Sequence, residues 1–588
     1  MARTLALMFS VIAGLCAFEL FLSYGASDGV DLIDWVRAAF ICVSTFWLAW
    51  GAAQAVAGLT TRPPIPARHT GAIEAKTVVL VPVYNEDPVA TFARVAAMDA
   101  AIRATGLGDK FHIAILSDTR DEKIALREEH WFLRLLSETR GEGRIFYRRR
   151  DQNHGRKAGN IAEFIKSSGA AYDFAIILDA DSLMEAATMV EMVRRIQAEP
   201  NLGLLQTLPK IINARSRFGR LMQFSSSFYS PIFCRGLAMM QGRTGPFWGH
   251  NAIVRVPAFA ASCGLPELSG SPPFGGHILS HDYVEAALLA RQGWIVRVDD
   301  DLEGSYEEGP ENIVDHAKRD RRWCQGNLQH SRLLLAPGLK PWSRFVFLQG
   351  ILAYLSSLLW LGFLLGSIAA PLFTPPVDYF PIEGWPFPVL PPSETLKAIA
   401  LGLGIVGLLL IPKVLILTDA ARRGRSIGFG GVGQTIRSGV SEFLYTSIAA
   451  PVFLMYQTRS ILQVVFGIDG GWPAQVRGDG QLDFGQAWAA SNWIVFSGAI
   501  GLALTHFFAP HLLMWLLPVT GPMVLAPLII AWCSRPGNER LFSTPLTLTS
   551  STLIKEHHRI LSRWLGEDQS TSSKSVGSGA AQRTIARV

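Results

Sequence analysis

Long apolar runs near both ends of the chain are the strongest pattern in the sequence. A helix needs about 20 apolar residues to cross a bilayer. Six runs are long enough, near 4–24, 38–58, 345–372, 396–418, 490–508 and 510–532. The first run has the length of a signal peptide, but its small-residue end is weak and a second run follows at once. We therefore interpret it as a membrane anchor and predict a polytopic membrane protein.

The charges of the connecting segments predict which side of the membrane each one faces. Residues 26–35 and 375–395 carry acidic side chains and no basic ones, whereas arginines follow the second and fourth apolar runs. Basic residues accumulate in cytoplasmic loops. We therefore predict a multi-pass protein whose termini and central region lie in the cytoplasm.

The segment 438–468 is ambiguous. It is apolar enough to cross a membrane, but it contains Glu442, Pro451 and Arg459. If it crossed, the basic tail after residue 535 would lie outside the cell, against the charge rule. The pattern favours a helix in the cytoplasmic interface, or a re-entrant hairpin, followed by a loop at 469–485.

The region between the apolar ends alternates strand-like and helix-like patterns. Three continuous Val/Ile/Leu runs end in polar residues, as is typical of strands buried on both faces of a parallel sheet: 77–85, 111–118 and 174–181. Helical patterns separate or follow them at 89–105, 122–139 and 158–168. The pattern predicts a mostly parallel α/β domain, with its ligand site at the carboxyl ends of the strands.

Composition agrees with this division. The chain is 49% hydrophobic and 17% charged, which is too apolar for a wholly soluble protein and too charged for a wholly embedded one. We expect two N-terminal membrane helices in 1–65, the α/β domain inserted at 66–340, a membrane region at 341–535, and a cytoplasmic tail at 536–588 with a disordered end.

Charge and cysteine content exclude two classes of protein. The net charge is +6, but the basic residues are spread along the chain. A nucleic-acid-binding protein would carry a denser basic patch, so no nucleic-acid partner is expected. The six cysteines lie far apart and form no CxxC pair, which indicates reduced structural thiols and neither a zinc site nor a disulfide framework.

Acidic side chains stand where two of the predicted strands end. Asp118 closes the second strand, and Asp179 and Asp181 close the third. Residues i and i+2 of a strand lie on the same side, so Asp179 and Asp181 could share a cation. Mg²⁺ (or Mn²⁺) binds one or two carboxylates together with substrate phosphates. Solvated loop acids or a helix N-cap are the alternatives.

Two predicted helix starts carry further candidate chemistry. The segment 153–160, "NHGRKAGN", places glycines around Lys157, whose charge could contact a phosphate; a plain turn is the alternative. The helix predicted at 280–294 has Asp282 in its first turn. Such a residue is either an N-cap or a general base, because the helix N-terminus favours the ionised carboxylate.

In their order along the chain, these motifs resemble those of the processive membrane synthases of glycosyltransferase family 2. The matching segments are "VPVYNED", "ILSD", "KAGN", "LDAD", "HD" and "RDRRW". Further segments are similar to the members of that family that build the glucose backbone of osmoregulated periplasmic glucans: "GHNAIVR", "RDRRWCQGNLQH", "APVFLMYQTRSIL" and "LFSTP". The resemblance implies a nucleotide-sugar-binding domain of the GT-A type between membrane helices.

The resemblance also implies roles for single residues. Those at the nucleotide and donor sugar would be Tyr84, Glu86, Asp118, Lys157 and Asp179. Asp181, together with Asp179, would hold the divalent metal, and Asp282 would be the catalytic base. The family usually has Thr-Glu-Asp where this chain has Ser280-His281-Asp282, so the base is retained while the contacts of His281 cannot be carried over.

The segment 319–323, "RDRRW", corresponds to the QxxRW motif of the family, with Arg319 in place of the usual Gln. Arg319 and Arg322 would neutralise the departing diphosphate, because a guanidinium binds phosphate oxygens with two parallel hydrogen bonds. Trp323 would offer a flat face to the acceptor sugar. A basic stripe that binds anionic lipid headgroups is the alternative.

Three further positions complete the expected site. Trp248 and Asn251 are expected on the acceptor side, although core packing is an alternative for Trp248. Residues 214–233 mix arginine with aromatic residues and predict an amphipathic helix in the interface. By position, Trp472 resembles part of the gating loop of cellulose-type synthases; a plain connector is the alternative.

The resemblance implies an inverting, processive glucosyltransferase of the bacterial inner membrane. It would use UDP-glucose to build, and to export, a linear β-1,2-glucan, with an acyl carrier protein and a periplasmic glucan-modifying protein as further partners. The alternatives are a synthase of another β-linked polymer, an enzyme that adds one sugar to a lipid phosphate, and a non-catalytic nucleotide-sugar sensor or export scaffold.

Overall fold

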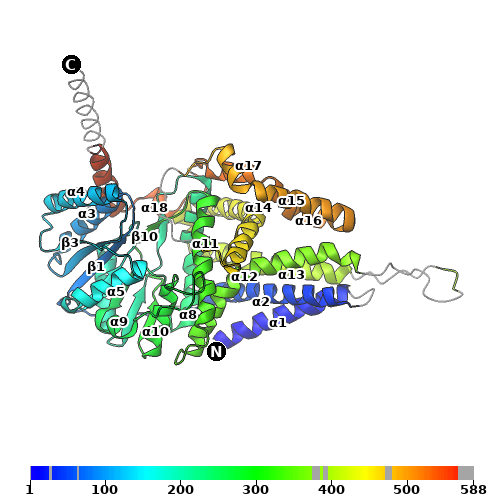
Figure 1. Cartoon of the computed structure of the whole chain (residues 1–588), viewed down its shortest axis with the longest axis horizontal. Coiled ribbons are helices and arrows are strands. Elements are labelled where there is room, and N and C mark those ends of the chain that lie inside the picture. Colours follow the sequence, from blue (N-terminus) through cyan, green and yellow to red (C-terminus); the bar gives the residue numbers. More distant parts are fainter. Residues whose placement is uncertain are drawn as a thin grey trace, which may run out of the picture.

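The chain divides into a mixed α/β domain and a set of long helices that extend away from it (Figure 1). The structure is a computed structural model, which describes residues 2–25, 30–61, 65–373, 385–387, 395–469, 480–538, 540–566 and 568. The predicted gating residue Trp472 and the predicted disordered end of the tail lie outside the described residues.

The domain is built on a seven-stranded sheet with the order β3-β2-β1-β4-β8-β6-β9. Its strands are β1 (Thr77–Val83), β2 (Phe111–Ser117), β3 (Ile145–Arg149), β4 (Phe174–Ile177), β6 (Leu202–Gln206), β8 (Ala252–Arg255) and β9 (Ile295–Val298). β1 pairs in parallel with β2 and β4, whereas β8 is antiparallel to both of its neighbours. The three predicted strands are therefore confirmed, and their carboxyl ends meet at one edge. β4 ends at Ile177, however, so Asp179 and Asp181 lie in the turn after it and not on the strand itself.

The predicted helices of the domain are also confirmed: α3 (Pro88–Ala104), α4 (Glu122–Thr139) and α5 (Arg156–Ser168). They cover both faces of the sheet, because alternate side chains of a strand point in opposite directions. Val79 and Val81 of β1 belong to the core that contains Phe92 of α3. Val78 and Leu80 belong to the opposite core. This explains why the strand runs are continuously apolar.

Smaller elements complete the domain around the sheet edge. A second sheet has the order β5-β10-β7, formed by β5 (Leu183–Met184), β10 (Ser305–Glu308) and β7 (Lys210–Ile212). The remaining helices are α6 (Ala186–Ala198), α7 (Arg217–Phe228), α8 (Ser230–Gln241), α9 (Val256–Ser262), α10 (His281–Arg291) and α11 (Ile313–Gln329). The amphipathic segment predicted at 214–233 is therefore divided, with Pro231 in the first turn of α8.

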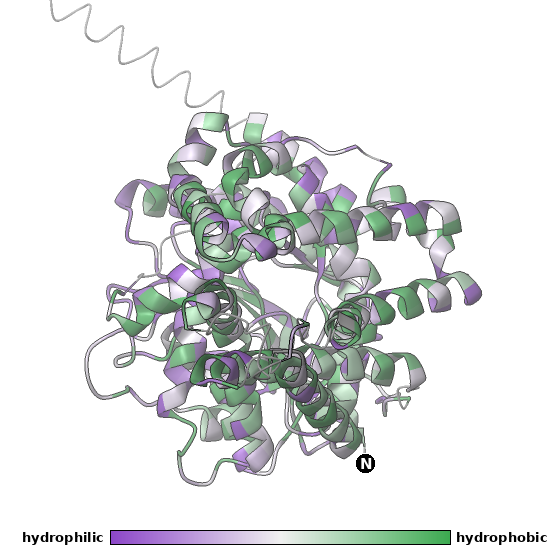
Figure 2. Cartoon of the chain, turned by 90° about the vertical axis from the view of Figure 1, so that its right-hand side faces the viewer, coloured by the Kyte–Doolittle hydropathy of each residue, from purple (hydrophilic) through white to green (hydrophobic). Residues whose placement is uncertain are grey.

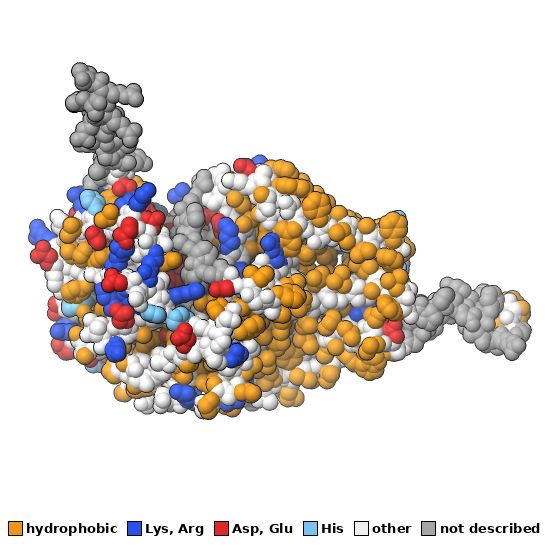
Figure 3. Space-filling view, viewed as in Figure 1, with side chains coloured by type: hydrophobic (Ala, Val, Ile, Leu, Met, Phe, Trp, Pro, Cys, Tyr) orange, Lys and Arg blue, Asp and Glu red, His pale blue; other side chains and the backbone are white. Residues whose placement is uncertain are grey.

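On the face shown in Figure 3, the surface of the helical part is largely hydrophobic, whereas charged side chains gather on the domain. Figure 2 looks roughly along these helices and shows many hydrophobic residues (green) on them. The helices of the helical part are α1 (Ala2–Gly25), α2 (Leu32–Thr60), α12 (Pro341–Ala369), α13 (Thr395–Arg422), α14 (Val432–Val465), α15 (Phe484–Phe508), α16 (Leu513–Val524) and α17 (Ala526–Ser534). Within the described residues, six helices are long and apolar enough to cross a membrane.

Two predictions for the membrane region need correction. The run at 510–532 is not one straight span, because α16 and α17 meet at a bend of 57°. Prolines at 518 and 522 inside α16, and at 527 in the first turn of α17, account for the break. The re-entrant hairpin considered for 438–468 is also wrong, since residues 438–465 belong to the continuous helix α14.

Both described ends of the chain lie on the domain side of the helical part. Arg3 of α1 donates a hydrogen bond of 2.6 Å to the carbonyl of Gln241, at the end of α8. At the other end, a helix at 552–566 contributes Leu553, Ile560 and Trp564 to the core of the domain. The chain that leaves the domain at α12 must therefore return to the same side.

This return requires an even number of membrane crossings among the apolar helices from α12 onward. Five apolar units follow one another in the described residues: α12, α13, α14, α15 and the bent pair α16–α17. At least one of them must therefore stay on the domain side. α14 is held by the domain, since Arg321 of α11 donates to the side chain of Gln463 at 3.1 Å. The parity therefore favours the prediction that α14 lies in the interface.

Helices α2 and α8 cross at two glycines. A methyl group on Gly58 would lie 1.9 Å from the carbonyl oxygen of Ile232, and one on Gly236 would lie 1.9 Å from that of Gln54. Both obstacles are backbone atoms, so no side-chain rotation can relieve them. This close approach fixes the domain helix α8 to the N-terminal pair of apolar helices.

Gly236→Ala is expected to lower the stability of the detergent-solubilised protein by about 1–3 kcal/mol, the usual cost of overpacking. The helices must separate to admit the methyl group, which loosens their contact. Thermal unfolding followed by intrinsic fluorescence measures this change. Gly433→Ala in α14 is the matched control, because a methyl group there meets nothing within 4 Å. Equal unfolding temperatures for the two variants would contradict the close crossing.

Candidate active site

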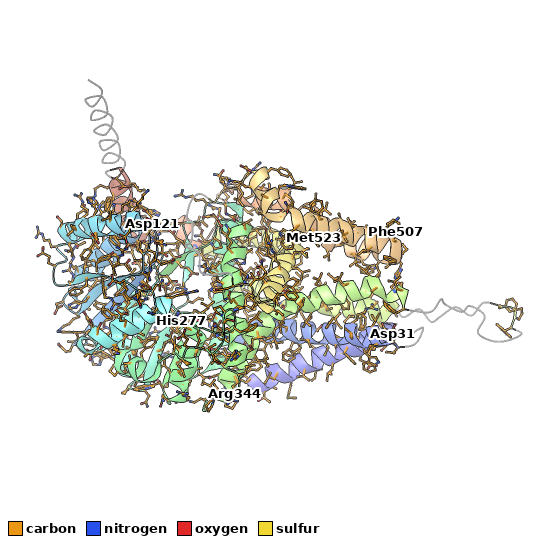
Figure 4. The ribbon with its side chains drawn as sticks, in the orientation of Figure 1. Asp31, Asp121, His277, Arg344, Phe507 and Met523 are labelled. Atoms are coloured by element: carbon orange, nitrogen blue, oxygen red, sulfur yellow. The ribbon has the colours of Figure 1, made fainter. Side chains whose placement is uncertain are left out.

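A cavity of about 1000 Å³ opens where the carboxyl ends of β1 and β4 meet α5, α10 and α11. Most of the predicted site residues line it: Tyr84, Glu86, Asp118, Lys157, Asp179, Asp181, Trp248, Asp282, Arg319, Arg322 and Trp323. His277, which Figure 4 labels, also lies on its wall. Residues that span about 240 positions of the sequence therefore share one space.

The acidic turn after β4 forms one end of the cavity. The turn is closed by two hydrogen bonds, from Ser182 N–H to the carbonyl of Asp179 (3.0 Å) and from Asp179 N–H to Ser182 Oγ (2.9 Å). Lys157 forms an ion pair with Asp179. Although burial raises the pKa of Asp179, the charges of Lys157 and Arg319 hold it well below its usual range. Asp179 is therefore ionised at neutral pH.

The residues of this turn fit a divalent cation. The Asp181 carboxylate is mostly buried and lies on the cavity wall, and Asp179 lies two positions before it. Carboxylates are the ligands that Mg²⁺ and Mn²⁺ prefer. Within the described residues there is no cluster of three or more His, Cys, Asp or Glu side chains that could hold a metal. A cation here would therefore need further oxygen ligands from a bound substrate.

Asp118 is held by a buried arginine that the sequence pattern did not reveal. Arg150 follows β3 and donates to both carboxylate oxygens of Asp118, at 2.7 and 2.9 Å. It also donates to the carbonyls of His154 and Arg156, both at 3.1 Å. Arg150 thus ties the end of β2 to the loop that leads into α5. Its position after a strand was the only sequence signal.

Glycines shape the start of α5. Gly155 has φ +66°, the left-handed conformation that favours glycine. A methyl group on Gly159 would lie 2.0 Å from the carbonyl oxygen of His154. The loop can therefore turn tightly into the helix, and Lys157 falls in the first turn and reaches the cavity. This agrees with the glycine pattern around Lys157 in the sequence.

Asp282 lies in the first turn of α10, on the cavity wall. Burial raises the pKa of its carboxyl, and the neighbouring Glu285 adds to this effect, whereas His281 opposes it. His281 contacts Glu285 through Nδ1 at 3.0 Å. Gly249 packs against Asp282, since a methyl group on it would lie 3.5 Å from the Asp282 Cβ atom. A raised pKa makes Asp282 a stronger base than an exposed aspartate.

Lys157 connects the two acidic ends of the site. Besides pairing with Asp179, its ammonium donates to the carbonyl of Gly249 at 2.7 Å. Gly249 is the residue that packs on Asp282. Asp179 and Asp282 therefore face a common space across the Gly249 loop, which is the arrangement needed for a donor and an acceptor to meet.

Helix α11 supplies positive charge and an aromatic face. The guanidinium of Arg319 lies over the Trp323 ring, 4.4 Å from its centroid. Burial, followed by the charge of Arg319, lowers the pKa of Arg322 to about 10, while Asp179 and Glu86 oppose this change. Arg322 therefore keeps its charge at neutral pH. Together with Lys157, these arginines suit the cavity to a diphosphate.

The end of α11 also fixes Asp282 in place. The loop before α10 is held by Gln329, which accepts a hydrogen bond of 3.0 Å from Leu279 N–H, and by His330, whose Nε2 lies 2.9 Å from the Ser280 carbonyl. Gly326 faces Ser280, where a methyl group would lie 2.2 Å from Oγ. Gly326, Gln329 and His330 follow the RDRRW segment in sequence. Their role in holding the loop before Asp282 depends on the end of α11 lying against the start of α10.

The cavity continues to the apolar helices. Gly350, Ala353 and Tyr354 of α12 and Gln457 of α14 line it at that end. Tyr354 donates to the carboxylate of Asp320 at 3.1 Å. The strand ends of the domain and the helical part therefore share one continuous space.

Two predicted acceptor contacts have different outcomes. Trp248 lines the cavity, and its backbone N–H donates to Gln206 at 3.0 Å. Asn251 is fully buried, and it is absent from the cavity wall formed by the described residues. Its side-chain amide instead donates to Ser305 Oγ (2.9 Å) and to the carbonyl of Tyr306 (3.2 Å). Asn251 thus holds β10 in place rather than exposing its side chain.

None of the six cysteines, all within the described residues, forms a disulfide, as the sequence predicted. Four of them are buried: Cys234, Cys263, Cys324 and Cys533. Burial raises the pKa of Cys234 and Cys263 far above the usual range of a thiol. These two thiols are therefore structural rather than nucleophilic.

Two family descriptions match the chain. Residues 78–262 match "Glycosyl transferase family 2", and residues 174–409 match "Glycosyl transferase family group 2". The matched residues contain the acidic turn, Asp282 and the arginines of α11. Together with the mostly parallel sheet, this confirms the expected α/β glycosyltransferase domain of the GT-A type.

Known proteins match over most of the chain. A glucans biosynthesis glucosyltransferase H from Cereibacter sphaeroides is 62% identical over 96% of this chain and 95% of its own length. One from Rhodopseudomonas palustris is 40% identical over 89% of this chain and 75% of its own length. A mannosyltransferase from Pyrobaculum calidifontis, solved with GDP-Man and Mn²⁺, is 14% identical with a TM-score of 0.45, covering 73% of this chain and 99% of its own. The chain is thus a membrane-associated glycosyltransferase and belongs to the glucans biosynthesis glucosyltransferase H group of glycosyl transferase family 2.

Proposed function

We propose that this protein is an inverting, processive glucosyltransferase that uses UDP-glucose to build a linear β-1,2-glucan. One observation carries the proposal: Asp118, Asp179, Asp181, Asp282 and the arginines of α11 line a single cavity. That cavity has an acidic turn for a metal, cations for a diphosphate and a base for an acceptor. The relatives named for glucan biosynthesis support glucose as the sugar.

The reaction is a direct displacement. Asp282 accepts the proton of an acceptor hydroxyl while the hydroxyl oxygen attacks the anomeric carbon. The bond from that carbon to the diphosphate breaks on the opposite face, and UDP leaves. A single base, with the acceptor between it and the donor sugar, fits direct displacement with inversion. The raised pKa of Asp282 favours proton acceptance.

The negative charge of the leaving group is balanced by cations of the cavity. Arg319 and Arg322 face the acidic turn, and Lys157 pairs with Asp179 until a diphosphate competes for it. A Mg²⁺ or Mn²⁺ ion held by Asp181 and Asp179 would supply further neutralisation of the diphosphate. Trp323, which is 40% exposed, offers a ring face to the acceptor sugar.

The growing polymer would pass from this cavity into the helical part. The cavity already extends to α12 and α14, so a product sugar could move directly toward the membrane. This arrangement supports export in the bacterial inner membrane, with the domain and both termini in the cytoplasm. An acyl carrier protein and a periplasmic glucan-modifying protein stay predictions.

The purified protein is expected to release UDP from UDP-glucose in the presence of a divalent metal and to form a polymer. Linkage analysis of the product from labelled UDP-glucose is expected to give 1,2-linked glucose. Another linkage would favour a different polymer, and a single-sugar lipid product would exclude processive synthesis. Binding of UDP-glucose without release of UDP, whichever acceptor is supplied, would support a nucleotide-sugar sensor.

Asp181→Ala is expected to weaken metal-dependent UDP binding by about 10–100-fold, because the turn loses its most buried carboxylate ligand. Titration calorimetry with UDP, with and without Mn²⁺, measures the effect. Asp121→Ala is the control, since Asp121 is exposed, caps α4 and does not line the cavity. Equal metal dependence in Asp181→Ala and the unsubstituted protein would exclude the metal assignment.

A further inference from the structure

A chain of hydrogen bonds runs from the acidic turn to the C-terminal helix at 552–566. It begins at the Ala180 carbonyl, which lies between Asp179 and Asp181. Arg94 of α3 donates to this carbonyl at 3.2 Å. The other end of the same guanidinium lies 2.8 Å from the carboxylate of Glu308, at the end of β10. The Arg94 side chain is 6% exposed.

The chain continues through Asn213 to a residue far away in the sequence. The side-chain amide of Asn213 donates to Glu308 at 3.1 Å. The side-chain oxygen Oδ1 of Asn213 lies 3.1 Å from Nε2 of His558, on the exposed side of the C-terminal helix. His558 is thereby connected to the acidic turn through Asn213, Glu308 and Arg94.

The C-terminal helix packs tightly on the domain, so the end of the hydrogen-bond chain at His558 is held in place. Trp564 is fully buried, with its ring centroid 5.1 Å from that of Trp131 in α4. Its indole N–H donates to Glu138 at 3.1 Å. Leu553 and Ile560 belong to the same hydrophobic core as Phe92 of α3. The helix therefore packs as part of the domain, although about 200 residues of membrane region separate the two in sequence.

His557 restricts the surroundings of Arg94 further. It is 1% exposed, and neither ring nitrogen has a hydrogen-bond partner among the described residues. Burial, followed by the charge of Arg94, lowers its pKa to about 3. His557 is therefore neutral at physiological pH and fills space beside Arg94 without competing for Glu308.

In the Arg94–Glu308 ion pair the arginine is buried and the glutamate partly exposed. Such a pair contributes little to stability, because desolvation offsets the attraction between the charges. A role in positioning therefore explains the Arg94–Glu308 pair better than a role in stability, because Arg94 also donates to the carbonyl of Ala180 in the acidic turn. We propose that Arg94 is a positioning residue for the acidic turn and that the C-terminal helix, through His558 and Asn213, sets the position of Arg94. This inference rests on the proposed function only for its consequence, the binding of metal and diphosphate by the turn.

The first test follows the turn itself by hydrogen exchange of the full-length protein in nanodiscs, without substrate. The reporting amides are those of Asp179 and Ser182, which close the turn. Loss of one hydrogen bond of the chain is expected to reduce their protection about 2–10-fold. His558→Ala is the main variant, because the side chain is exposed and its removal should not unfold the protein. Lys555→Ala, an exposed position on the same helix, is the control and should leave the protection unchanged.

The second test measures the Mn²⁺ concentration that half-saturates UDP binding. It is expected to rise about 2–10-fold in His558→Ala and further in Arg94→Gln, with Arg94→Lys in between. The double variant Arg94→Gln/His558→Ala should be no worse than Arg94→Gln alone, because both changes interrupt one chain. A loss of stability alone would lower the unfolding temperature without moving this midpoint.

The outcomes separate the inference from the proposed function. Faster exchange of the turn in His558→Ala, combined with no UDP binding by the unsubstituted protein, would support the positioning chain and exclude the proposed function. Metal-dependent UDP binding, combined with normal exchange and an unchanged midpoint in His558→Ala and Arg94→Lys, would overturn the positioning chain. Additive effects in the double variant would also overturn it.

Discussion

Asp282→Asn is expected to lower the rate of glucosyl transfer by about 10²–10⁴-fold, the usual contribution of a general base, while UDP binding persists. The amide has nearly the same shape as the carboxylate but cannot accept the acceptor proton. Asp282 lines the cavity at the start of α10, and the contacts of Gln329 and His330 hold the preceding loop. The geometry of the site should therefore survive the substitution.

The measurement is UDP release and polymer formation, with UDP affinity determined separately. Asp121→Asn is the matched control, an aspartate at another helix start that lies outside the cavity. Transfer at an undiminished rate in Asp282→Asn would show that another group is the base. Loss of UDP binding would instead show that Asp282 supports the donor site.

The pH dependence of transfer offers an independent check on Asp282. The base acts as a carboxylate, so the rate should fall as the pH drops through its pKa. Burial raises that pKa, with Glu285 adding to the shift and His281 opposing it. The acidic limb of kcat/KM should therefore lie above the value of about 3.9 expected for an exposed aspartate. A limb at or below that value would contradict the buried base.

Arg322→Ala is expected to reduce kcat by about 10²–10³-fold, the effect of removing one preorganised charge at a developing anion. The guanidinium lies on the cavity wall near Asp179 and Glu86 and keeps its charge despite burial. Diphosphate gains charge as it leaves, so the loss should appear in kcat more than in KM.

Lys318→Ala is the matched control for Arg322→Ala. Lys318 lies on the same helix, but its side chain is 67% exposed and pairs with Asp315 on the surface. Arg322→Lys should restore part of the activity, because it keeps the charge but loses the bidentate geometry. If Arg322→Ala and Lys318→Ala behaved alike, the diphosphate assignment for α11 would fail.

The local pattern of the sequence was enough to predict the framework of the site. Continuous apolar runs predicted β1, β2 and β4, because a strand covered on both faces shows no polar alternation. Polar residues at their carboxyl ends predicted where Asp118, Asp179 and Asp181 would gather. Parallel strands bring these ends to one edge whatever the rest of the chain does.

The supporting contacts could not be predicted in this way. Three of these contacts join residues that are far apart in sequence. The separations are 32 positions for Arg150 and Asp118, 46 for Gly326 and Ser280, and 86 for Arg94 and Ala180. Asn251 looked like a site residue in its motif, but the structure buries it under β10. Local periodicity contains no information about such pairs.

The sequence by itself determined which segments are apolar, where the strands and helices of the domain lie, and which side chains stand at the strand ends. Each of these features follows from the pattern of apolar and polar residues within one segment, without reference to the rest of the chain. Only the tertiary structure decided that the C-terminal helix packs into the domain, that α16 and α17 bend apart and that α11 holds the loop before Asp282. These depend on the path of the chain between distant segments, which brings together side chains that no local pattern relates.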